Sequence, residues 1–254
     1  METVKSLLLV WKNKLDNLYY HVGTLNYDGT KYLFHYTDES NSSRSVNEAL
    51  KKGYTLHPAF PELNKKYESK SLFEAFNRRI PDKSRRGYDE ILEEFNLDLS
   101  SDRMDLLRET RGALSGDPYT FEEPLRLNGS QLKTNFYING MRHRENLDKN
   151  WPDHINEGNT LNLEIEEGNK HDVYAVKILD DYGTHIGYVP GIYAQAVYSL
   201  VKQEAPIRIT VLQTRPNFAP QWWVRVEMNA FVELGSKHYK DDSNLMSLIF
   251  EEGA

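Results

Sequence analysis

Apolar and aromatic residues occur in short runs over the opening third of the chain, and polar turn residues separate these runs. The runs cover residues 7–11, 18–25 and 31–36. Between the second and third runs lie Asp28 and Gly29, a pair that favours the tight turn of a β-hairpin. The pattern therefore predicts an antiparallel meander of three strands at the beginning of the chain.

Helical spacing replaces the strand pattern in the middle of the chain. Ser71 and Glu74 have the spacing of a capping box, apolar residues then recur every three or four positions, and Pro81 ends the pattern. A second helix is predicted with Ser84 as its cap, and a third over residues 101–110. The sequence therefore places helices after the first strands.

Two polar stretches interrupt these elements. Residues 38–53 are rich in Ser and Asn in their first part and are expected to form a loop, and residues 125–130 are typical of a strand end and a linker. We therefore place a domain boundary in the second stretch. This boundary gives a first module over residues 1–127 and a second module over residues 131–254.

The second module has mainly strand patterning. Residues 161–166 alternate between apolar and polar types, as a half-buried strand does. Further strands are predicted over 175–179, 185–189, 207–212 and 222–232, and helices over 192–202 and 240–252. The predicted fold class is α+β, with an antiparallel N-terminal sheet and helices followed by a small β-barrel-like module with one or two helices.

Composition limits the classes of protein to which this chain can belong. The chain has 254 residues, of which 39% are hydrophobic, and it has no cysteine, which excludes disulfides and thiolate metal sites. The apolar run 7–11 is too short for a signal peptide or a membrane span, so we expect a soluble cytoplasmic protein without membrane contact. Because the formal net charge is -7, any nucleic-acid binding has to come from a local site.

The sequence motifs of common enzyme classes are lacking. No phosphate-binding glycine loop and no nucleophile elbow occurs, and the 8 histidines are scattered without the spacing of metal ligands. We therefore assign no catalytic residue, no metal ligand and no cofactor, and we expect a protein that is not an enzyme. A hydrolase that uses carboxylates outside such motifs stays open as a third reading.

Three segments of the second module follow one another in an order that resembles a known family. Residues 169–172 (Asn-Lys-His-Asp) precede an Ala-Val strand, residues 186–190 (Ile-Gly-Tyr-Val-Pro) follow it, and residues 136–143 lie upstream. Together these segments resemble the HIRAN domain over residues 131–233. The resemblance implies a compact β-barrel that binds the 3′ end of single-stranded DNA in a small pocket.

The resemblance implies roles for several residues of this pocket. Asn169 and Asp172 would hydrogen-bond the terminal nucleotide, with Asp172 accepting from the 3′ hydroxyl, and Tyr188 would form the pocket wall. A carboxylate that accepts from a hydroxyl repels a terminal phosphate, so the pocket would select a free end. Without the resemblance, Asn169, His171 and Asp172 also suit a turn that begins a strand.

Three further residues complete the implied pocket. Arg142 would face a phosphate, while His143 and His171 occupy the positions at which bases would stack. DNA-binding members of the family typically carry tyrosines at the two stacking positions, and a basic residue is common in the family at the position of Gly191. Residues 130–233 hold 10 Lys and Arg against 13 Asp and Glu. These departures favour an alternative in which the module does not bind DNA.

The first module resembles the N-terminal subdomain of HipA-type kinases over residues 4–124. The similar segments are 10–13 (Val-Trp-Lys-Asn), 22–25, 32–36, 73–82 and 112–117. In that family the subdomain is not the catalytic part, and some related systems carry it as a separate small protein that restrains a kinase toxin. The resemblance therefore implies a bacterial protein whose first module docks a protein partner.

Taken together, these patterns predict a non-catalytic binding protein. Its second module would recognise a single-stranded DNA end, and its first module would dock a protein partner. The alternative is an antitoxin-like factor of a toxin–antitoxin system, which binds and restrains a HipA-type serine/threonine kinase without binding DNA.

Overall fold

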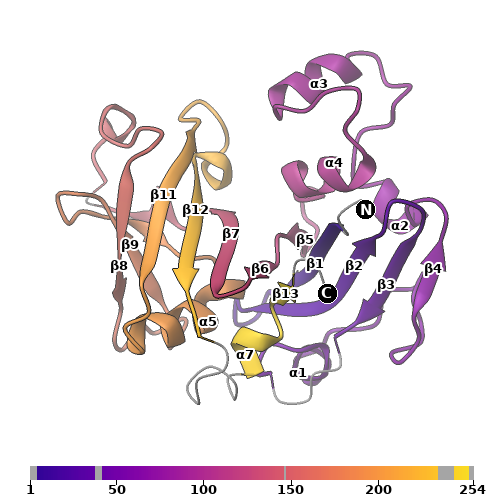
Figure 1. The fold of residues 1–254 in the computed structure, drawn as a ribbon, viewed down its shortest axis with the longest axis horizontal. Helices are drawn as coiled ribbons and strands as arrows, with labels where there is room; N and C mark the ends of the chain where they lie inside the picture. The colour runs from indigo at the N-terminus through magenta and orange to yellow at the C-terminus, as the bar shows by residue number, and fades with distance from the viewer. Residues whose placement is uncertain (1–4, 38–41, 146, 234–242, 252–254) are drawn as a thin grey trace. The chain divides into compact units, whose positions relative to one another are not determined.

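The residues described by the computed structural model are 5–37, 42–145, 147–233 and 243–251. They divide by their internal contacts into two units, Met1–Pro124 and Leu125–Ala254 (Figure 1). Each unit has a β-sheet of its own.

A five-stranded antiparallel sheet forms the first unit. Its strands are β1 (Lys5–Lys12), β2 (Tyr19–Tyr27), β3 (Tyr32–Tyr36), β4 (Tyr67–Ser69) and β5 (Tyr119–Glu122), in the order β4-β3-β2-β1-β5. The three strands predicted from the apolar runs are therefore present. The turn between β2 and β3 is held by the Asp28 carboxylate, which accepts from the backbone N–H groups of Thr30 and Lys31.

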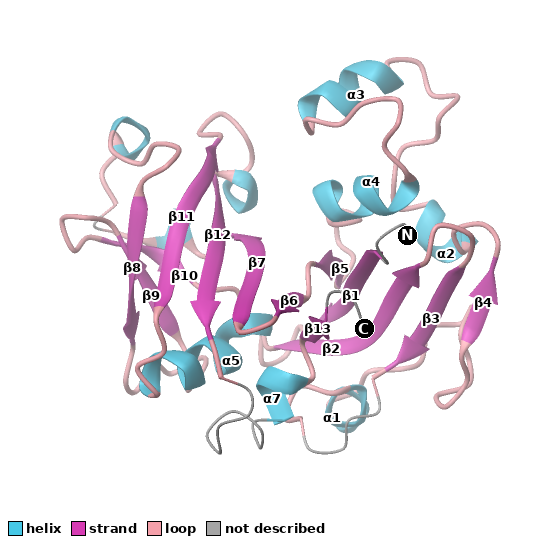
Figure 2. Ribbon diagram, viewed as in Figure 1, coloured by secondary structure: helices cyan, strands magenta, loops and turns pink. Residues whose placement is uncertain are grey.

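The helices of the first unit are shorter than the sequence pattern suggested (Figure 2). They are α1 (Val46–Lys51), α2 (Glu74–Asn77), α3 (Tyr88–Glu94) and α4 (Arg103–Thr110). The loop prediction for residues 38–53 was wrong over α1, because Val46 and Ala49 bury one face of this helix; residues 38–41 lie outside the described residues. The prediction of α4 was confirmed to within two residues at its beginning.

Both predicted serine caps were wrong. The capping position of α2 is Phe73 and not Ser71, and no side chain caps this one-turn helix. Ser84 bonds to the Asp82 carboxylate instead, and α3 begins after Gly87, whose φ of 79° is in the left-handed region. Aromatic packing holds α2 against the core, since Phe76 is buried against other rings.

An aromatic cluster fills the core of the first unit. Phe34, Phe60 and Phe76 contact one another with ring centroids 4.4 to 5.3 Å apart, and Phe121 of β5 lies 5.1 Å from Phe76. Such pairs stabilise a core beyond the area that they bury. The cluster joins the sheet to α2 and to the segment that follows α1.

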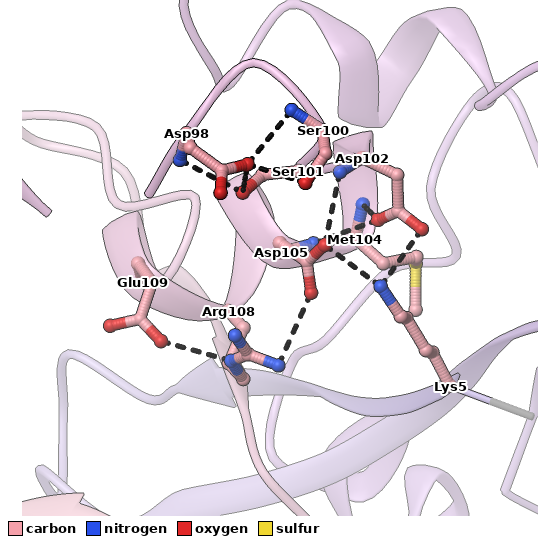
Figure 3. A network of polar contacts seen from close by, with 9 residues as sticks. All are labelled: Lys5, Asp98, Ser100, Ser101, Asp102, Met104, Asp105, Arg108 and Glu109. Carbon is pink, nitrogen blue, oxygen red and sulfur yellow. Dashed lines mark hydrogen bonds and ion pairs between the residues drawn. The ribbon is translucent and has the colours of Figure 1, made fainter. Parts of the chain in front are cut away.

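A network of charged side chains attaches α4 to β1 (Figure 3). Asp102 caps the helix and forms a capping box with Asp105. The Lys5 ammonium from β1 lies 3.0 Å from the Asp102 carboxylate and 2.8 Å from that of Asp105. Burial acts to raise the pKa of Asp105, but the bonds from Lys5 and from the Asp102 N–H outweigh it and lower this pKa.

A curled eight-stranded sheet forms the second unit. Its order is β10-β9-β8-β11-β12-β7-β6-β13. The strands are β6 (Leu125–Asn128), β7 (Gln131–Tyr137), β8 (Thr160–Ile165), β9 (Val176–Leu179), β10 (His185–Tyr188), β11 (Ile207–Thr214), β12 (Val224–Phe231) and β13 (Ile249–Glu251). Asn139, just after β7, exchanges two backbone hydrogen bonds of 2.9 and 2.8 Å with Tyr188 of β10. The sheet therefore curls until β7 and β10 meet, as a barrel-like fold requires.

One long helix packs into the curl, and the other helical segments are short. The long helix is α5 (Gly191–Lys202), and its Tyr193 is fully buried, 5.6 Å from the ring of Phe136. The described part of the second unit also holds α7 (Ser243–Met246) and the 3₁₀ turns η1 (Met141–His143), η2 (Trp151–Asp153) and η3 (Pro220–Trp222). The prediction of one or two helices thus omitted the three single-turn helices.

Two sequence predictions near the ends of this unit were wrong in part. The stretch 125–130, predicted as a strand end and linker, is strand β6 and the turn of a hairpin with β7. Of the helix predicted over residues 240–252, the described part contains only the four residues of α7, followed by β13, which pairs in parallel with β6. Residues 240–242 and 252 lie outside the described residues. Long-range pairing with β6 decides the conformation of β13.

Candidate functional site

The closing point of the curled sheet determines where a site can form in the second unit. The chain leaves β7, pairs with β10 through Asn139, and turns at Gly140, whose φ is 75°. A Cβ at Gly187 would lie 2.7 Å from the Asn139 carbonyl oxygen and 2.5 Å from Ile138, so only glycine allows β10 to approach this closely. The turn η1 and the residue after it, Arg144, are thereby held beside Tyr188.

Three polar side chains gather at Tyr188, and we call the four residues together the Tyr188 cluster: Arg144, Glu166, Asn169 and Tyr188. The Tyr188 hydroxyl donates to Glu166 Oε2 at 2.8 Å, and Asn169 Nδ2 donates to the same oxygen. Arg144 Nη1 donates to the Tyr188 hydroxyl at 3.1 Å, with the guanidinium carbon 4.8 Å from the ring centroid. One hydroxyl thus links a cation to a carboxylate.

The turn that follows β8 is organised by Asn169. Its Oδ1 accepts from the backbone N–H groups of His171 and Asp172, at 2.8 and 2.9 Å. The Asp172 carboxylate accepts from the Tyr174 N–H at 3.0 Å. This is the hydrogen bonding of a turn that begins a strand, and it leaves the side chain of His171 exposed.

Burial and hydrogen bonding shift three pKa values in the site. Burial acts to raise the pKa of Glu166, but the bonds from Asn169 and Tyr188 and the charge of Lys177 outweigh it and lower this pKa. Burial, together with the bond to Glu166, raises the pKa of Tyr188. Burial and the charge of Arg144 lower the pKa of His185, so its ring is mainly neutral at neutral pH.

A cavity of about 330 Å³ opens beside the Tyr188 cluster. His143, Arg144, Glu145 and His185 line it, and we call it the Arg144 cavity. The His185 ring packs edge-on against Tyr188, with centroids 4.6 Å apart. The cavity and the cluster therefore share Arg144 and form one continuous site.

The structure brings some of the six predicted site residues together. Asn169 and Tyr188 share the Glu166 carboxylate, and His143 lines the Arg144 cavity. Arg142 is exposed and donates through Nε to His143 Nε2 at 2.9 Å. His171 and Asp172 join the site through their backbone bonds to Asn169, so their predicted contacts with a nucleotide stay predictions.

Sequence reasoning missed four residues of this site: Arg144, Glu145, Glu166 and His185. Two of them carried a usable signal. Arg144 closes a run of basic residues that begins at Arg142, and Glu166 is a carboxylate at the end of a strand, three residues before Asn169. His185 lay at the beginning of a predicted strand and carried no signal of its own.

Comparison with known proteins identifies the domain that contains this site. Residues 132–235 match the family model of the HIRAN domain. The match covers less than half of the chain and lies within the second unit. The strands β6 and β13 lie outside the matched residues. No curated protein matches the sequence significantly.

Several solved structures are similar to parts of the chain. The crystal structure of the HIRAN domain of human HLTF is 16% identical to this chain in sequence. The similarity covers 50% of this chain and 100% of the HLTF chain, with a TM-score of 0.38. A crystal structure of a protein from Lactobacillus plantarum is 14% identical over 41% of this chain and 99% of its own, with a TM-score of 0.33. An NMR structure of the HLTF HIRAN domain in its DNA-bound conformation is 16% identical over 46% of this chain and 85% of its own, with a TM-score of 0.31.

Metal-binding clusters and membrane-spanning helices are both absent from the described ranges. There, no group of three or more His, Asp or Glu side chains is arranged to hold a metal ion. In the same ranges, no helix has both the length and the apolar character needed to cross a membrane. The resemblance of residues 4–124 to a HipA-type subdomain stays a prediction.

Proposed function

We propose that the second unit binds the end of a single-stranded nucleic acid, with the 3′ end of DNA as the favoured ligand. The observation that carries this proposal is the Tyr188 cluster beside the Arg144 cavity, inside a HIRAN domain. Support comes from the HLTF HIRAN domain, which has been solved in a DNA-bound conformation. The proposed role is binding, without catalysis.

The charge of the chain is compatible with such a local site. The whole chain has a formal net charge of -7, which disfavours general attraction to phosphates. Arg142 and Arg144 nevertheless stand on either side of His143 in the sequence, and Arg144 lines the cavity, so two cations lie at or next to it. A strand end needs only a few phosphate contacts and one or two stacked bases, each stacked base contributing about 1–3 kcal/mol.

Fluorescence anisotropy with short labelled DNA tests the proposal. The probes are a single strand with a 3′ hydroxyl, the same strand with a 3′ phosphate, and a blunt duplex, each at two salt concentrations. We expect the 3′ hydroxyl strand to bind most tightly and the 3′ phosphate strand to bind more weakly, because the Asp172 carboxylate repels a terminal phosphate. The duplex should bind at least about tenfold more weakly than the 3′ hydroxyl strand, since a duplex end offers no unstacked base. If the chain binds none of the three, the proposal is wrong.

Two substitutions locate the binding site in the same assay. Asn169→Ala removes the residue that organises the turn after β8, so we expect it to weaken binding by about tenfold. Asp172→Ala tests the hydroxyl contact that the family resemblance assigns to this carboxylate. If Asp172 makes that contact, its removal weakens binding to the 3′ hydroxyl strand and not to the 3′ phosphate strand.

A second candidate function concerns the first unit. We propose that this unit docks a protein partner of the HipA-type kinase class, and the alternative is that the chain restrains such a kinase without binding DNA. The histidines at the two stacking positions and the acidic balance of residues 130–233 favour this alternative. Co-purification of the full chain with a HipA-type kinase, and inhibition of its phosphorylation activity, would support it. DNA binding without any kinase effect would contradict it.

A further inference from the structure

Arg144 is a cation of the second unit that has no ion-pair partner among the described residues. Arg144 is half-buried, and its Nε atom is buried without a hydrogen-bond partner. Among the residues that the structure describes, no carboxylate forms an ion pair with it. The polar side chain that its guanidinium contacts is the neutral hydroxyl of Tyr188. A guanidinium that is partly removed from water without a counter-ion is energetically costly.

The neighbouring cations are in a different situation. Lys177 lies 3.2 Å from the Glu164 carboxylate and 3.7 Å from that of Glu166, so two carboxylates compensate its charge. Arg142 is exposed to solvent. An incoming anion would therefore be stabilised more by Arg144 than by Lys177 or Arg142.

The surroundings of Arg144 suit an anion of the size of a phosphate. The guanidinium is fixed in place by stacking on Tyr188 and by the bond to its hydroxyl, so little side-chain entropy remains to be lost. Because Arg142 Nε–H donates to His143 Nε2, a neutral His143 carries its hydrogen on Nδ1 as a further donor. Both Arg144 and His143 line the cavity, and the carboxylate of Glu145, which also lines it, is exposed to solvent.

We infer that the Arg144 cavity holds one phosphate group of the bound strand and that Arg144 is its principal cation. This inference rests on the proposed function and assigns to Arg144 the contact that the family resemblance assigned to Arg142. The phosphate can come from two sources, a phosphodiester of the strand or a terminal phosphomonoester. The Tyr188 cluster positions Arg144 for either one.

Salt-dependent binding of the full-length chain tests the inference. Removing one contact between a cation and a phosphate of a single strand reduces the slope of log affinity against log salt by about 0.7. We expect Arg144→Ala to lower affinity for the 3′ hydroxyl strand by about tenfold and to reduce this slope by about that amount. Arg144→Lys keeps the charge and should retain the slope, with an affinity between those of wild type and Arg144→Ala.

Control variants separate this role from a general decrease in positive charge. Arg208 is an exposed arginine on β11 that does not line the cavity, so Arg208→Ala should change neither affinity nor slope appreciably. Arg142→Ala should have a smaller effect than Arg144→Ala. If Arg142→Ala lowers the affinity and the slope while Arg144→Ala keeps both, the inference is wrong.

A strand with an uncharged methylphosphonate in one linkage identifies the phosphate without any change to the protein. If Arg144 contacts that phosphate, the affinity of wild type falls about tenfold, and that of Arg144→Ala falls little further on the same strand. Comparing 3′ phosphate and 3′ hydroxyl strands then separates the terminal from the internal source. If no single phosphate, internal or terminal, interacts with Arg144 in this way, the inference is contradicted.

The outcomes also separate this inference from the proposed function. If wild type binds no strand, the proposed function has failed. If wild type binds and Arg144→Ala binds with the same affinity and slope, the inference alone has failed. Thermal unfolding of each variant shows whether it is folded. Should Arg144→Ala be unfolded, Arg144→Lys and the methylphosphonate strands on wild type decide the question.

Discussion

Glu166 illustrates how a single carboxylate can hold two other side chains of a site in place. Its carboxylate accepts from both Tyr188 and Asn169, which stand on β10 and on the turn after β8. These two donors lower its pKa, so the carboxylate stays charged through the neutral range. Glu166 therefore connects the turn that carries His171 and Asp172 to the side chain on which Arg144 stacks.

Substitution of Glu166 separates its geometric effect from its electrostatic effect. If Glu166 acted only as a negative charge near phosphates, Glu166→Ala would strengthen DNA binding. We expect the opposite, a decrease in affinity of about tenfold, because Tyr188 and Asn169 are left without their common acceptor. Glu166→Gln keeps an acceptor oxygen, so its decrease should be smaller. Anisotropy titration of the two variants measures this, and stronger binding by Glu166→Ala would refute the positioning role.

At the scale of an element, α4 depends on charged side chains as well as on apolar burial. Met104, Leu106 and Leu107 bury one side of this eight-residue helix. Its beginning is held by the capping box of Asp102 and Asp105 and by Lys5 from β1 (Figure 3). A helix of this length is marginal by itself, so these tertiary contacts stabilise it.

The stabilising effect of Asp105 should depend on pH. Its pKa is lowered in the folded state, so its contribution is fully present above the unfolded pKa of about 3.8 and is lost as pH falls through the lower folded value. We expect Asp105→Ala to destabilise the first unit by about 1 kcal/mol at pH 7, and the difference from wild type to shrink below pH 4. Urea denaturation at several pH values measures this.

A matched carboxylate on another helix serves as the control for this prediction. Glu93 of α3 is exposed, so Glu93→Ala should change stability by less than about 0.5 kcal/mol at any pH. A destabilisation by Asp105→Ala that is the same at pH 7 and at pH 3 would contradict the role of the charge.

At the scale of the whole molecule, the second unit extends beyond the matched HIRAN residues at both ends. β6 precedes the match and pairs with β7, and β13 follows the match and pairs with β6. The Leu125 N–H donates to the Leu248 carbonyl at 2.8 Å, and the side chain of Leu125 is fully buried. The two added strands are therefore part of the fold of this unit.

Truncation tests this view of the second unit. A fragment of residues 125–254 retains β6, whereas a fragment of residues 131–254 lacks it and leaves β13 without its partner strand. Removing the buried Leu125 and Leu127 side chains costs roughly 1.5–3 kcal/mol each, so we expect the shorter fragment to melt at least about 5 °C lower. Circular dichroism measures both transitions. Equal melting temperatures would show that β6 is dispensable.

Local patterns were sufficient to predict many elements of both units. The apolar runs gave β1, β2 and β3, and the alternation of residues 161–166 gave β8. These predictions succeed because side-chain burial in a strand follows the local period of two residues. The same local information placed Asn169 in a turn and Tyr188 at the end of a strand.

Tertiary structure decided the features that depend on residues far apart in the sequence. The partners Arg144 and Tyr188 are separated by 44 positions, and Glu166 and Tyr188 by 22, so no local pattern could indicate that they meet. Likewise, β13 is a strand because β6 offers it an edge. The sequence by itself determined many of the local conformations and the order of the segments that match the HIRAN domain. Closure of the curled sheet determined which side chains share a site, because long-range pairing and burial outweigh local preference.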